Sequence, residues 1–337
     1  MLYGHGDDAY IYSNSIRANF SSNVNFAGPS PELVKYLAEC LSNIGSYPEV
    51  MAESLANQVS DIEGVSCIIT NGATEAFYLI AQTWKHSKSL IIVPSFAEYE
   101  SACTINNHDI TLLTQSNIQN INLGLFNLVW LCNPNNPDGY ITSFNQIESW
   151  IKTYPSTIFV IDEAYIDFVE NLESAKLLIS LYNNLIVIRS LTKHFAIPGL
   201  RLGYILSQGV NLDKIDKIRM PWSVNSLAIE AGKFLLKNPN VTHFNVSEYQ
   251  YIASELKNKL SEIKNIKVYS SATPYFLLKN LRGTAKELHQ WLLERGILVR
   301  NADNFREIGN SFVRISTQNE ADNLILINAL KEWSSQQ

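Results

Sequence analysis

Short, continuous apolar runs alternate with polar turns and helical segments through the first two thirds of the chain. The runs do not alternate apolar with polar residues, as a strand with one wet face does, so they indicate strands buried on both faces of a mainly parallel sheet. Helical segments between such strands predict an α/β layered fold. The predicted strands are Ser66–Ile69, Leu90–Val93, Leu128–Cys132, Thr157–Ile161, Leu185–Ile188 and Leu202–Leu206.

The pattern differs at both ends of the chain. Residues 1–30 are polar and irregular, so we expect an N-terminal arm that lies across other parts of the molecule. After residue 225, a long amphipathic stretch over about residues 242–263 precedes short strands and further helices. We therefore expect a large domain over 31–225 and a smaller α+β domain over 226–337, whose predicted strands are Ile266–Val268, Tyr275–Leu278, Ile297–Val299 and Phe312–Ile315.

Composition narrows the class of protein. The 337 residues are 46% hydrophobic and 17% charged, with a net charge of −6 at pH 7. These values are typical of a globular protein and argue against a basic surface for nucleic acid or an anionic membrane. No apolar run approaches the ~20 residues of a membrane helix, and the first residues do not resemble a signal peptide, so we expect a cytoplasmic protein. The cysteines are far apart in sequence, which favours buried free thiols over a metal site.

Polar residues follow several of the predicted strands, at the end of the sheet where ligands collect. The most informative is Lys193, which follows an apolar run and lies among hydroxyls and a second cation, Arg201. An amine desolvated beside cationic groups loses its proton more readily and can form an imine with a carbonyl. Ser190 and Thr192, with Arg201, could hold a phosphate. An imine-forming lysine beside a phosphate cradle indicates pyridoxal phosphate as cofactor.

Other strand ends supply further parts of such a site. Gly72-Ala73-Thr74 precedes a predicted helix whose first N–H groups could bind a phosphate, although an ordinary N-cap at Thr74 is the alternative. Asp162 ends a buried run, and a carboxylate at that depth needs a partner. Either it pairs with a protonated pyridine nitrogen, or it caps a turn of the backbone. Tyr165 and Asn136 could hydrogen-bond the cofactor's phenolic oxygen. Phe96 could stack on its ring, or pack in the core.

Two arginines interrupt or follow apolar strands in the C-terminal region. Arg314 lies within Phe312–Ser316, and Arg300 follows Ile297–Val299. A guanidinium in an apolar strand is expected to face an anion, and bidentate pairing with a carboxylate is its natural role. We therefore take both arginines as candidate substrate-binding residues.

Three motifs, in order, carry a resemblance to a known family. They are N-P-N-N-P-x-G, here with Asp138 where threonine is usual, then D-E-A-Y, and S-x-[ST]-K-x-x-x-x-x-G-x-R-x-G. Over essentially its full length the chain resembles the aspartate-aminotransferase-like superfamily of pyridoxal-phosphate enzymes, whose fold is type I. The resemblance implies a large domain with a mainly parallel sheet and a smaller α+β C-terminal domain.

The resemblance also implies roles for single residues. Lys193 would bond covalently to the cofactor, Asp162 would pair with its ring nitrogen, and Asn136 and Tyr165 would reach its phenolic oxygen. Phe96 would stack on the ring, and the phosphate would be held by Gly72, Ala73, Ser190, Thr192 and Arg201. Tyr47 matches the tyrosine that reaches the phosphate of the neighbouring subunit in this family, which implies a homodimer with shared active sites.

Two families within the superfamily are similar to the chain. Histidinol-phosphate aminotransferases share the general plan, including an arginine after I-L-V. Threonine-phosphate decarboxylases of cobalamin biosynthesis resemble it more closely in His5-Gly6, F-S-x-N-x-N, P-S-F-A-E-Y and the segment around Trp222. The closer resemblance implies decarboxylation of L-threonine O-3-phosphate to aminopropanol phosphate, with amino transfer to 2-oxoglutarate as the alternative. It implies that Arg314 binds the substrate carboxylate. The candidates for binding the substrate phosphate are Arg300, His5 and Asn25.

Overall fold

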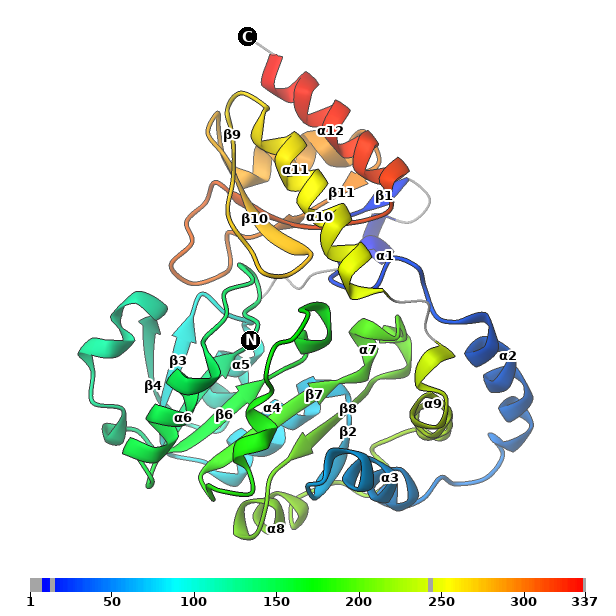
Figure 1. Ribbon diagram of the computed structural model, residues 1–337, viewed down its shortest axis with the longest axis vertical. Helices are drawn as coiled ribbons and strands as arrows, with labels where there is room; N and C mark the ends of the chain where they lie inside the picture. The colour runs from blue at the N-terminus through cyan, green and yellow to red at the C-terminus, as the bar shows by residue number, and fades with distance from the viewer. Residues whose placement is uncertain (1–7, 13–15, 242–244, 336–337) are drawn as a thin grey trace.

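The structure is a computed structural model that describes residues 8–12, 16–241 and 245–335. A broad lower part is built on a large sheet, and a smaller upper part carries the helices near the C-terminus (Figure 1). The helices are α1 Ala9–Tyr12, α2 Pro31–Cys40, α3 Glu53–Glu63, α4 Gly72–Thr83, α5 Glu98–Ile105, α6 Phe144–Thr153, α7 Leu191–His194, α8 Val210–Asp216, α9 Ser226–Lys237, α10 Val246–Ser261, α11 Ala285–Leu293 and α12 Glu320–Ser335.

In the described ranges the large sheet has seven strands in the order β2-β8-β7-β6-β5-β3-β4. Only β8 runs against its neighbours, and the other adjacent pairs are parallel. Every strand predicted from the apolar runs is present, which confirms the α/β class. The strands are β2 Cys67–Asn71, β3 Lys88–Val93, β4 Asp109–Thr114, β5 Leu128–Cys132, β6 Ile158–Asp162, β7 Leu185–Ser190 and β8 Leu202–Leu206.

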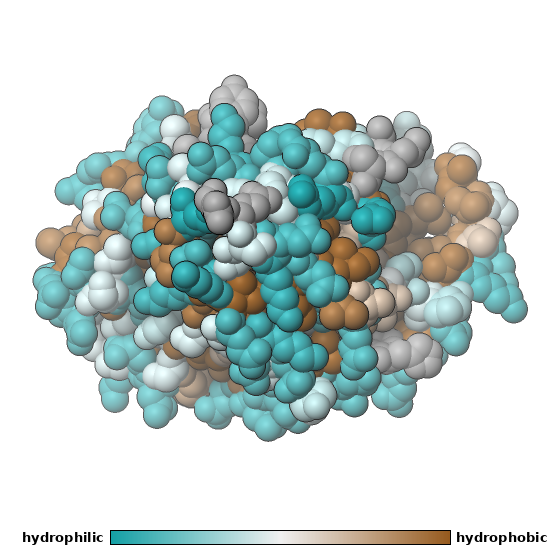
Figure 2. Space-filling model, turned by 90° about the horizontal axis from the view of Figure 1, so that it is seen from above, coloured by the Kyte–Doolittle hydropathy of each residue, from teal (hydrophilic) through white to brown (hydrophobic). Residues whose placement is uncertain are grey.

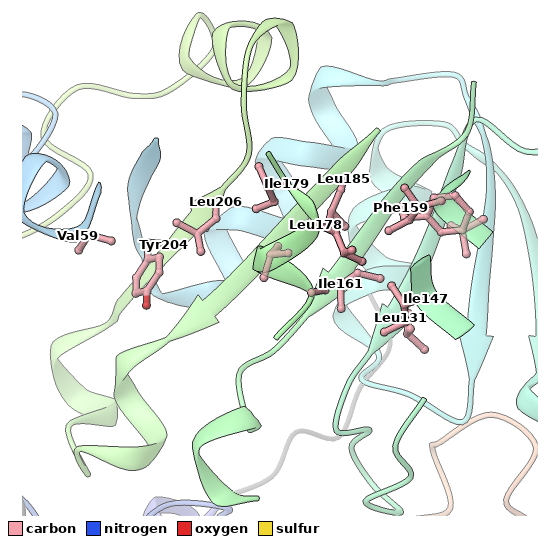
Figure 3. Packing of buried hydrophobic residues seen from close by; sticks show 14 of the residues in the cluster. Val59, Leu131, Ile147, Phe159, Ile161, Leu178, Ile179, Leu185, Tyr204 and Leu206 are labelled. Atoms are coloured by element: carbon pink, nitrogen blue, oxygen red, sulfur yellow. The ribbon is translucent and has the colours of Figure 1, made fainter. Parts of the chain in front are cut away.

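Both faces of this sheet are buried, as the continuous apolar runs predict. Alternate residues of one strand enter different clusters: Leu131 faces the side covered by α3, α6 and α9, whereas Trp130 faces α4, α5 and α8. Figure 3 shows the first cluster around Leu131, Phe159 and Ile161. Because two helical layers clamp the central strands, the residues at the strand ends have fixed positions.

The edge strand β4 was not predicted from the sequence. It pairs with β3 at one end of the sheet, and Ile110–Thr114 are only half-buried. An edge strand with partial cover needs no fully apolar run, so its sequence carried no strong signal.

The upper part contains a second, four-stranded antiparallel sheet in the order β12-β13-β10-β9. Its core is formed with α10, α11 and α12, and it includes Ala18 and Phe20 from the N-terminal arm. Ala18–Asn19 form β1, which pairs in parallel with β11 Ile297–Leu298. The other strands are β9 Ile266–Val268, β10 Tyr275–Asn280, β12 Arg300–Asn301 and β13 Phe312–Ser316.

Division of the chain into domains stays a proposal. Helix α9 packs on α2 and α3, and its Ala228 and Ile229 belong to the core beside the large sheet. We therefore propose that α9 belongs with the large domain, although the sequence predicted a boundary at residue 225. Along the described ranges, no helix combines the length and apolar composition needed to cross a bilayer.

Candidate active site

A cavity of about 510 Å³ opens at the carboxyl ends of β5, β6 and β7, a size within the range of ligand pockets. Strand pairing sets Cys132 beside Asp162 and Asp162 beside Ile188, so the residues that follow these strands converge at one edge. The first turns of α4 and α5, residues 21–23 of the arm, and Arg314 of β13 complete the wall. The large sheet, the four-stranded sheet and the arm thus all contribute to one site.

The structure brings together most of the residues predicted from the sequence. Those that line the cavity are Ala73, Thr74, Phe96, Asn136, Asp162, Tyr165, Ser190, Thr192, Lys193, Arg201 and Arg314. Gly72 lies directly behind Arg201. Tyr47, Asn25 and Arg300 are not part of the lining, and His5 lies outside the described residues.

Asp162 is a buried carboxylate with one donor on each oxygen. The Tyr99 hydroxyl donates to its Oδ2 at 2.5 Å, and the Ala164 N–H donates to its Oδ1 at 2.9 Å. Burial raises the pKa of Asp162 to about 6, although these two hydrogen bonds and the Lys193 charge act in the opposite direction. A desolvated carboxylate of this kind binds a cationic group well, and a protonated pyridine nitrogen is such a group.

Two glycines make room for a cationic cradle at the start of α4. A Cβ at Gly72, where φ is +75°, would lie 2.3 Å from Nη2 of Arg201, and a Cβ at Gly203 would lie 2.7 Å from the Ala73 nitrogen. Only glycine permits this close approach. The ion pairs formed among the described residues do not include Arg201, whose pKa is lowered by burial. Its guanidinium and the first N–H groups of α4 together suit a phosphate.

The segment that carries Lys193 begins with a hydroxyl cap. Ser190 Oγ lies 2.8 Å from Thr192 Oγ1 and accepts a hydrogen bond from the Thr192 N–H at 3.4 Å, which starts the short helix α7. Lys193 follows directly and is half-buried on the cavity wall. The turn therefore presents two hydroxyls and an amine to the same space.

Arg314 is the cation on the side of the four-stranded sheet. It is 4% exposed, donates from Nη1 to Asn136 Oδ1 at 2.6 Å and from Nη2 to the Ser21 carbonyl at 2.5 Å, and leaves its Nε–H without a partner. Because Asn136 uses its oxygen on Arg314, its Nδ2 is the group left to donate to a ligand. Burial lowers the pKa of Arg314, and the ion pairs formed among the described residues do not include it.

The arm contributes Asn23 to the cavity and not Asn25. Asn25 donates from Nδ2 to the His194 carbonyl at 3.2 Å and accepts the Ala27 N–H at 3.0 Å, so its side chain is used within the fold. Asn23 is 5% exposed, and neither its Nδ2 nor its Oδ1 makes a hydrogen bond of good geometry, although the amide is close enough to the Tyr165 hydroxyl to act on its pKa. Buried amides without partners are uncommon, and one on a cavity wall indicates a ligand contact.

Two other predicted residues lie away from the lining. Tyr47 is 86% exposed, and its ring centroid lies 5.3 Å from that of Trp222. Arg300 donates from Nη2 to Asn304 Oδ1 at 2.7 Å and lies opposite Arg314 in the β12–β13 pair. Directly opposed residues of antiparallel strands point to the same face of the sheet, so Arg300 adds positive charge beside the cavity.

Sequence reasoning missed several lining residues, of which Tyr99 has the clearest chemistry. It lies three residues after Phe96 in the predicted P-S-F-A-E-Y motif, so the signal was present but was read for Phe96 alone. Ser21, Ser22 and Asn23 likewise belong to F-S-x-N-x-N. The remaining additions are Phe77, Glu98, Cys132, Ala164 and Pro198. Within the described ranges, no three His, Cys, Asp or Glu side chains gather in a group that could hold a metal ion.

The fold and the site define a pyridoxal-phosphate enzyme of fold type I. The residues present fit this cofactor. The buried Asp162 carboxylate can bind a cationic ring nitrogen, and Arg201 beside the N-terminus of α4 can bind a phosphate. Lys193 lies on the wall of the same cavity. Residues 18–330 match the model of the aminotransferase class I and II family. The chain belongs to this family, whose members depend on pyridoxal phosphate.

Similar proteins include two kinds of enzyme. The solved L-threonine-O-3-phosphate decarboxylase from Porphyromonas gingivalis is 36% identical, with a TM-score of 0.92, covering 95% of this chain and 100% of that one. The threonine-phosphate decarboxylase of Salmonella typhimurium is 28% identical over 93% of this chain and 90% of that protein. A histidinol-phosphate aminotransferase of Caldanaerobacter subterraneus is 31% identical over 89% of this chain and 88% of its own length.

Proposed function

We propose that the protein decarboxylates L-threonine O-3-phosphate to aminopropanol phosphate, a reaction of cobalamin biosynthesis. The observation that carries the proposal is a pair of arginines, since Arg314 lines the cavity and Arg300, outside the lining, is its direct partner in the β12–β13 pair. Burial and the nearby Arg314 lower the pKa of Arg300 to about 10. Two guanidinium groups held this close favour a substrate with more than one anionic group. L-Threonine O-3-phosphate carries both a carboxylate and a phosphate. The solved decarboxylase of this substrate from Porphyromonas gingivalis is similar in structure to this chain, with a TM-score of 0.92.

We propose these roles for the cofactor site. Asp162 holds the ring nitrogen, Asn136 and Tyr165 hold the phenolic oxygen, and Phe96 covers the ring. Burial raises the pKa of Tyr165 to about 12, so its hydroxyl keeps its proton and can donate. The phosphate is held by Gly72, Ala73, Thr74, Ser190, Thr192 and Arg201.

The cofactor, when bound, withdraws electrons from the bond that breaks at the substrate's α-carbon. Arg314 binds the substrate carboxylate and so decides its orientation, while Asn23 supplies an amide that makes no hydrogen bond of good geometry within the fold. The bond to the carboxylate breaks, carbon dioxide leaves, and the α-carbon takes up one proton. Lys193 is the proton donor on the cavity wall, because an amine can hold and transfer a proton at neutral pH once desolvated.

Amino transfer from histidinol phosphate is the second candidate. The 31% identity to a histidinol-phosphate aminotransferase supports it. Histidinol phosphate lacks a carboxylate, so in that reaction Arg314 would bind the carboxylate of 2-oxoglutarate instead. The two functions thus use the same cation for different substrates, and products must distinguish them.

We also propose a homodimer. Helix α2 and the segment that follows it carry exposed apolar side chains, namely Val34, Leu41, Ile44, Tyr47 and Val50, and the exposed Trp222 packs on Tyr47. Hydrophobic residues also form a patch at the right-hand end of the view in Figure 2. Most of the remaining face in that view is hydrophilic. A second copy that covers α2 and the segment after it would bury Tyr47, which could then reach the partner's cofactor phosphate. Sedimentation of wild type and of a Leu41→Glu, Ile44→Glu variant tests this, since charges there should yield monomers.

The direct test of the function is product analysis on cofactor-loaded protein. One sample receives O-phospho-L-threonine alone, and the other receives L-histidinol phosphate with 2-oxoglutarate. Carbon dioxide and aminopropanol phosphate from the first sample support the decarboxylase, and glutamate from the second sample alone establishes the aminotransferase. Lys193→Ala is the control and should give no product in either sample. A cytoplasmic location is a further proposal, tested by cell fractionation.

A further inference from the structure

Tyr99 is a buried residue of the cavity lining that has no role so far. Its side chain is 1% exposed, and its hydroxyl donates to Asp162 Oδ2 at 2.5 Å. We propose that Tyr99 is a positioning residue, whose hydroxyl fixes the Asp162 carboxylate and keeps it ionised so that it can hold positive charge on the cofactor's ring nitrogen. The inference rests on the proposed role of Asp162 and is independent of which substrate the enzyme uses.

Contacts with three aromatic side chains fix the position of the Tyr99 ring. It stacks on Trp130 at a centroid distance of 5.9 Å and an interplanar angle of 22°, and it meets Phe77 edge to face at 4.8 Å. Phe96, the proposed stacking residue, packs edge to face against the same ring at 6.1 Å. One side chain therefore supports both the acidic partner of the ring nitrogen and the aromatic group proposed to cover the ring.

The two hydrogen bonds that Asp162 accepts fall on different carboxylate oxygens. Tyr99 occupies one position on Oδ2, and the Ala164 N–H occupies one on Oδ1. Each carboxylate oxygen can accept a second hydrogen bond, so the group remains able to bind a donor from the cavity. Because both existing partners are donors, they favour the ionised carboxylate over the acid.

Burial favours the protonated carboxyl, and the Tyr99 bond is the first of the interactions that act against it. Desolvation raises the pKa of Asp162 to about 6, and burial with the neighbouring Asp162 charge holds the pKa of Tyr99 well above its usual value. Tyr99 thus stays a donor. The other titratable groups that face or adjoin Asp162 are Cys132 of β5, Glu163, Tyr165 and Lys193.

The test compares Tyr99→Phe with Tyr78→Phe. Tyr78 is a matched control, because its hydroxyl also donates to a carboxylate, Glu98 Oε2, at 2.7 Å, and it is not a lining residue. The titration of Asp162 is followed by NMR of protein labelled with carbon-13 in its aspartate carboxyls, without cofactor, and the Asp162→Asn spectrum assigns the signal. Tyr99→Phe should raise the Asp162 midpoint by about one to two pH units, whereas Tyr78→Phe should leave it unchanged.

A second readout links this shift to the cofactor. The dissociation constant of pyridoxal phosphate is measured against pH for the same proteins, and the midpoint below which binding weakens should move up with the Asp162 midpoint in Tyr99→Phe. An unchanged carboxyl titration would overturn the inference at its first step. A shifted titration with an unchanged binding midpoint would overturn the link between Asp162 and the ring nitrogen.

A milder substitution covers the case in which Tyr99→Phe does not fold. Placing 3-fluorotyrosine at position 99 alone keeps the ring and hydroxyl but makes the phenol more acidic and hence a stronger donor. The Asp162 midpoint should then fall, and a rise would contradict the proposal. Failure of the decarboxylase assay would leave these outcomes unaffected, so the two proposals are judged separately.

Discussion

Arg189 donates from Nη1 to Glu163 Oε2 at 3.1 Å, and this buried ion pair joins β7 to the residue directly after Asp162. Glu163 is fully buried and also accepts hydrogen bonds from Ser174 Oγ and the Ala175 N–H. Arg189 reaches Asp167 as well, at 3.2 Å. An ion pair therefore joins β7, which leads into Lys193, to the end of β6, which carries Asp162.

Loss of the cation should destabilise the protein strongly. Arg189→Met leaves the Glu163 carboxylate buried without a cation, which costs about 3–5 kcal/mol in the free energy of unfolding. The control is Arg306→Met, which removes a more exposed bidentate pair with Glu100 and should cost at most about 1 kcal/mol. Urea unfolding measures both values, and similar costs for the two variants would show that the buried pair contributes no more than the exposed one.

The two arm asparagines should behave in opposite ways. Asn23→Ala removes a buried amide that makes no hydrogen bond of good geometry, so it should leave the thermal midpoint unchanged or higher while lowering kcat/KM about tenfold or more. Asn25→Ala breaks two hydrogen bonds within the fold and should cost about 1–2 kcal/mol of stability. Calorimetry and steady-state kinetics check both. A large loss of stability in Asn23→Ala would assign that residue to the fold.

Arg300→Ala should weaken the binding of phosphorylated substrates more than the binding of their unphosphorylated analogues. A charge-assisted hydrogen bond to phosphate is lost, so KM for O-phospho-L-threonine should rise about tenfold or more, with a smaller change for L-threonine. Arg282→Ala is the control, because Arg282 lies in the same region but contacts Trp333 and not the cavity wall. Equal losses on both substrates would reassign Arg300 to a structural role.

His108 should make stability fall in mild acid. Its ring nitrogens contact Ser89 Oγ and the Ala81 carbonyl, each at 2.8 Å, and burial lowers its pKa below the ordinary value of 6.5. The unfolded chain therefore takes up the proton first, and the stability that the neutral ring contributes is present above about pH 6.5 and is lost as pH falls below it.

Asp162 acts in the opposite direction in part of this window, since its raised pKa makes the folded state bind a proton more readily. The measurement is therefore a difference. Unfolding free energies of wild type and His108→Gln at pH 7.5 and 5.5 should show a larger acid loss in wild type. Equal losses would mean that His108 does not titrate differently on folding.

The central sheet and its strand ends could be predicted because buried parallel strands leave unbroken apolar runs. Lys193, Asp162 and Asn136 follow such runs, so their convergence follows from topology alone. Strand β4 could not be predicted in the same way, because an edge strand is only partly covered.

The remaining parts of the site depend on directions that a sequence does not carry. Asn23 and Asn25 are two residues apart in an irregular arm, and only the course of the backbone decides which amide enters the cavity. Nothing in the sequence around Tyr99 distinguishes it from an ordinary core residue. Its contact with Asp162 arises only when α5 packs against β6. Tyr47 lies on the surface of this chain, so its role depends on a second copy.

The pairing of β1 with β11 sets an order on how the molecule can be completed as it is made. Ala18 and Phe20 lie in the core that α12 closes, although nearly the whole described chain separates them from Leu298 and Leu330. On the ribosome, this part of the arm emerges early and has no strand to pair with until Ile297 and Leu298 have been synthesised. The upper core therefore closes only after α12 has emerged, and with it the wall of the cavity that carries Arg314.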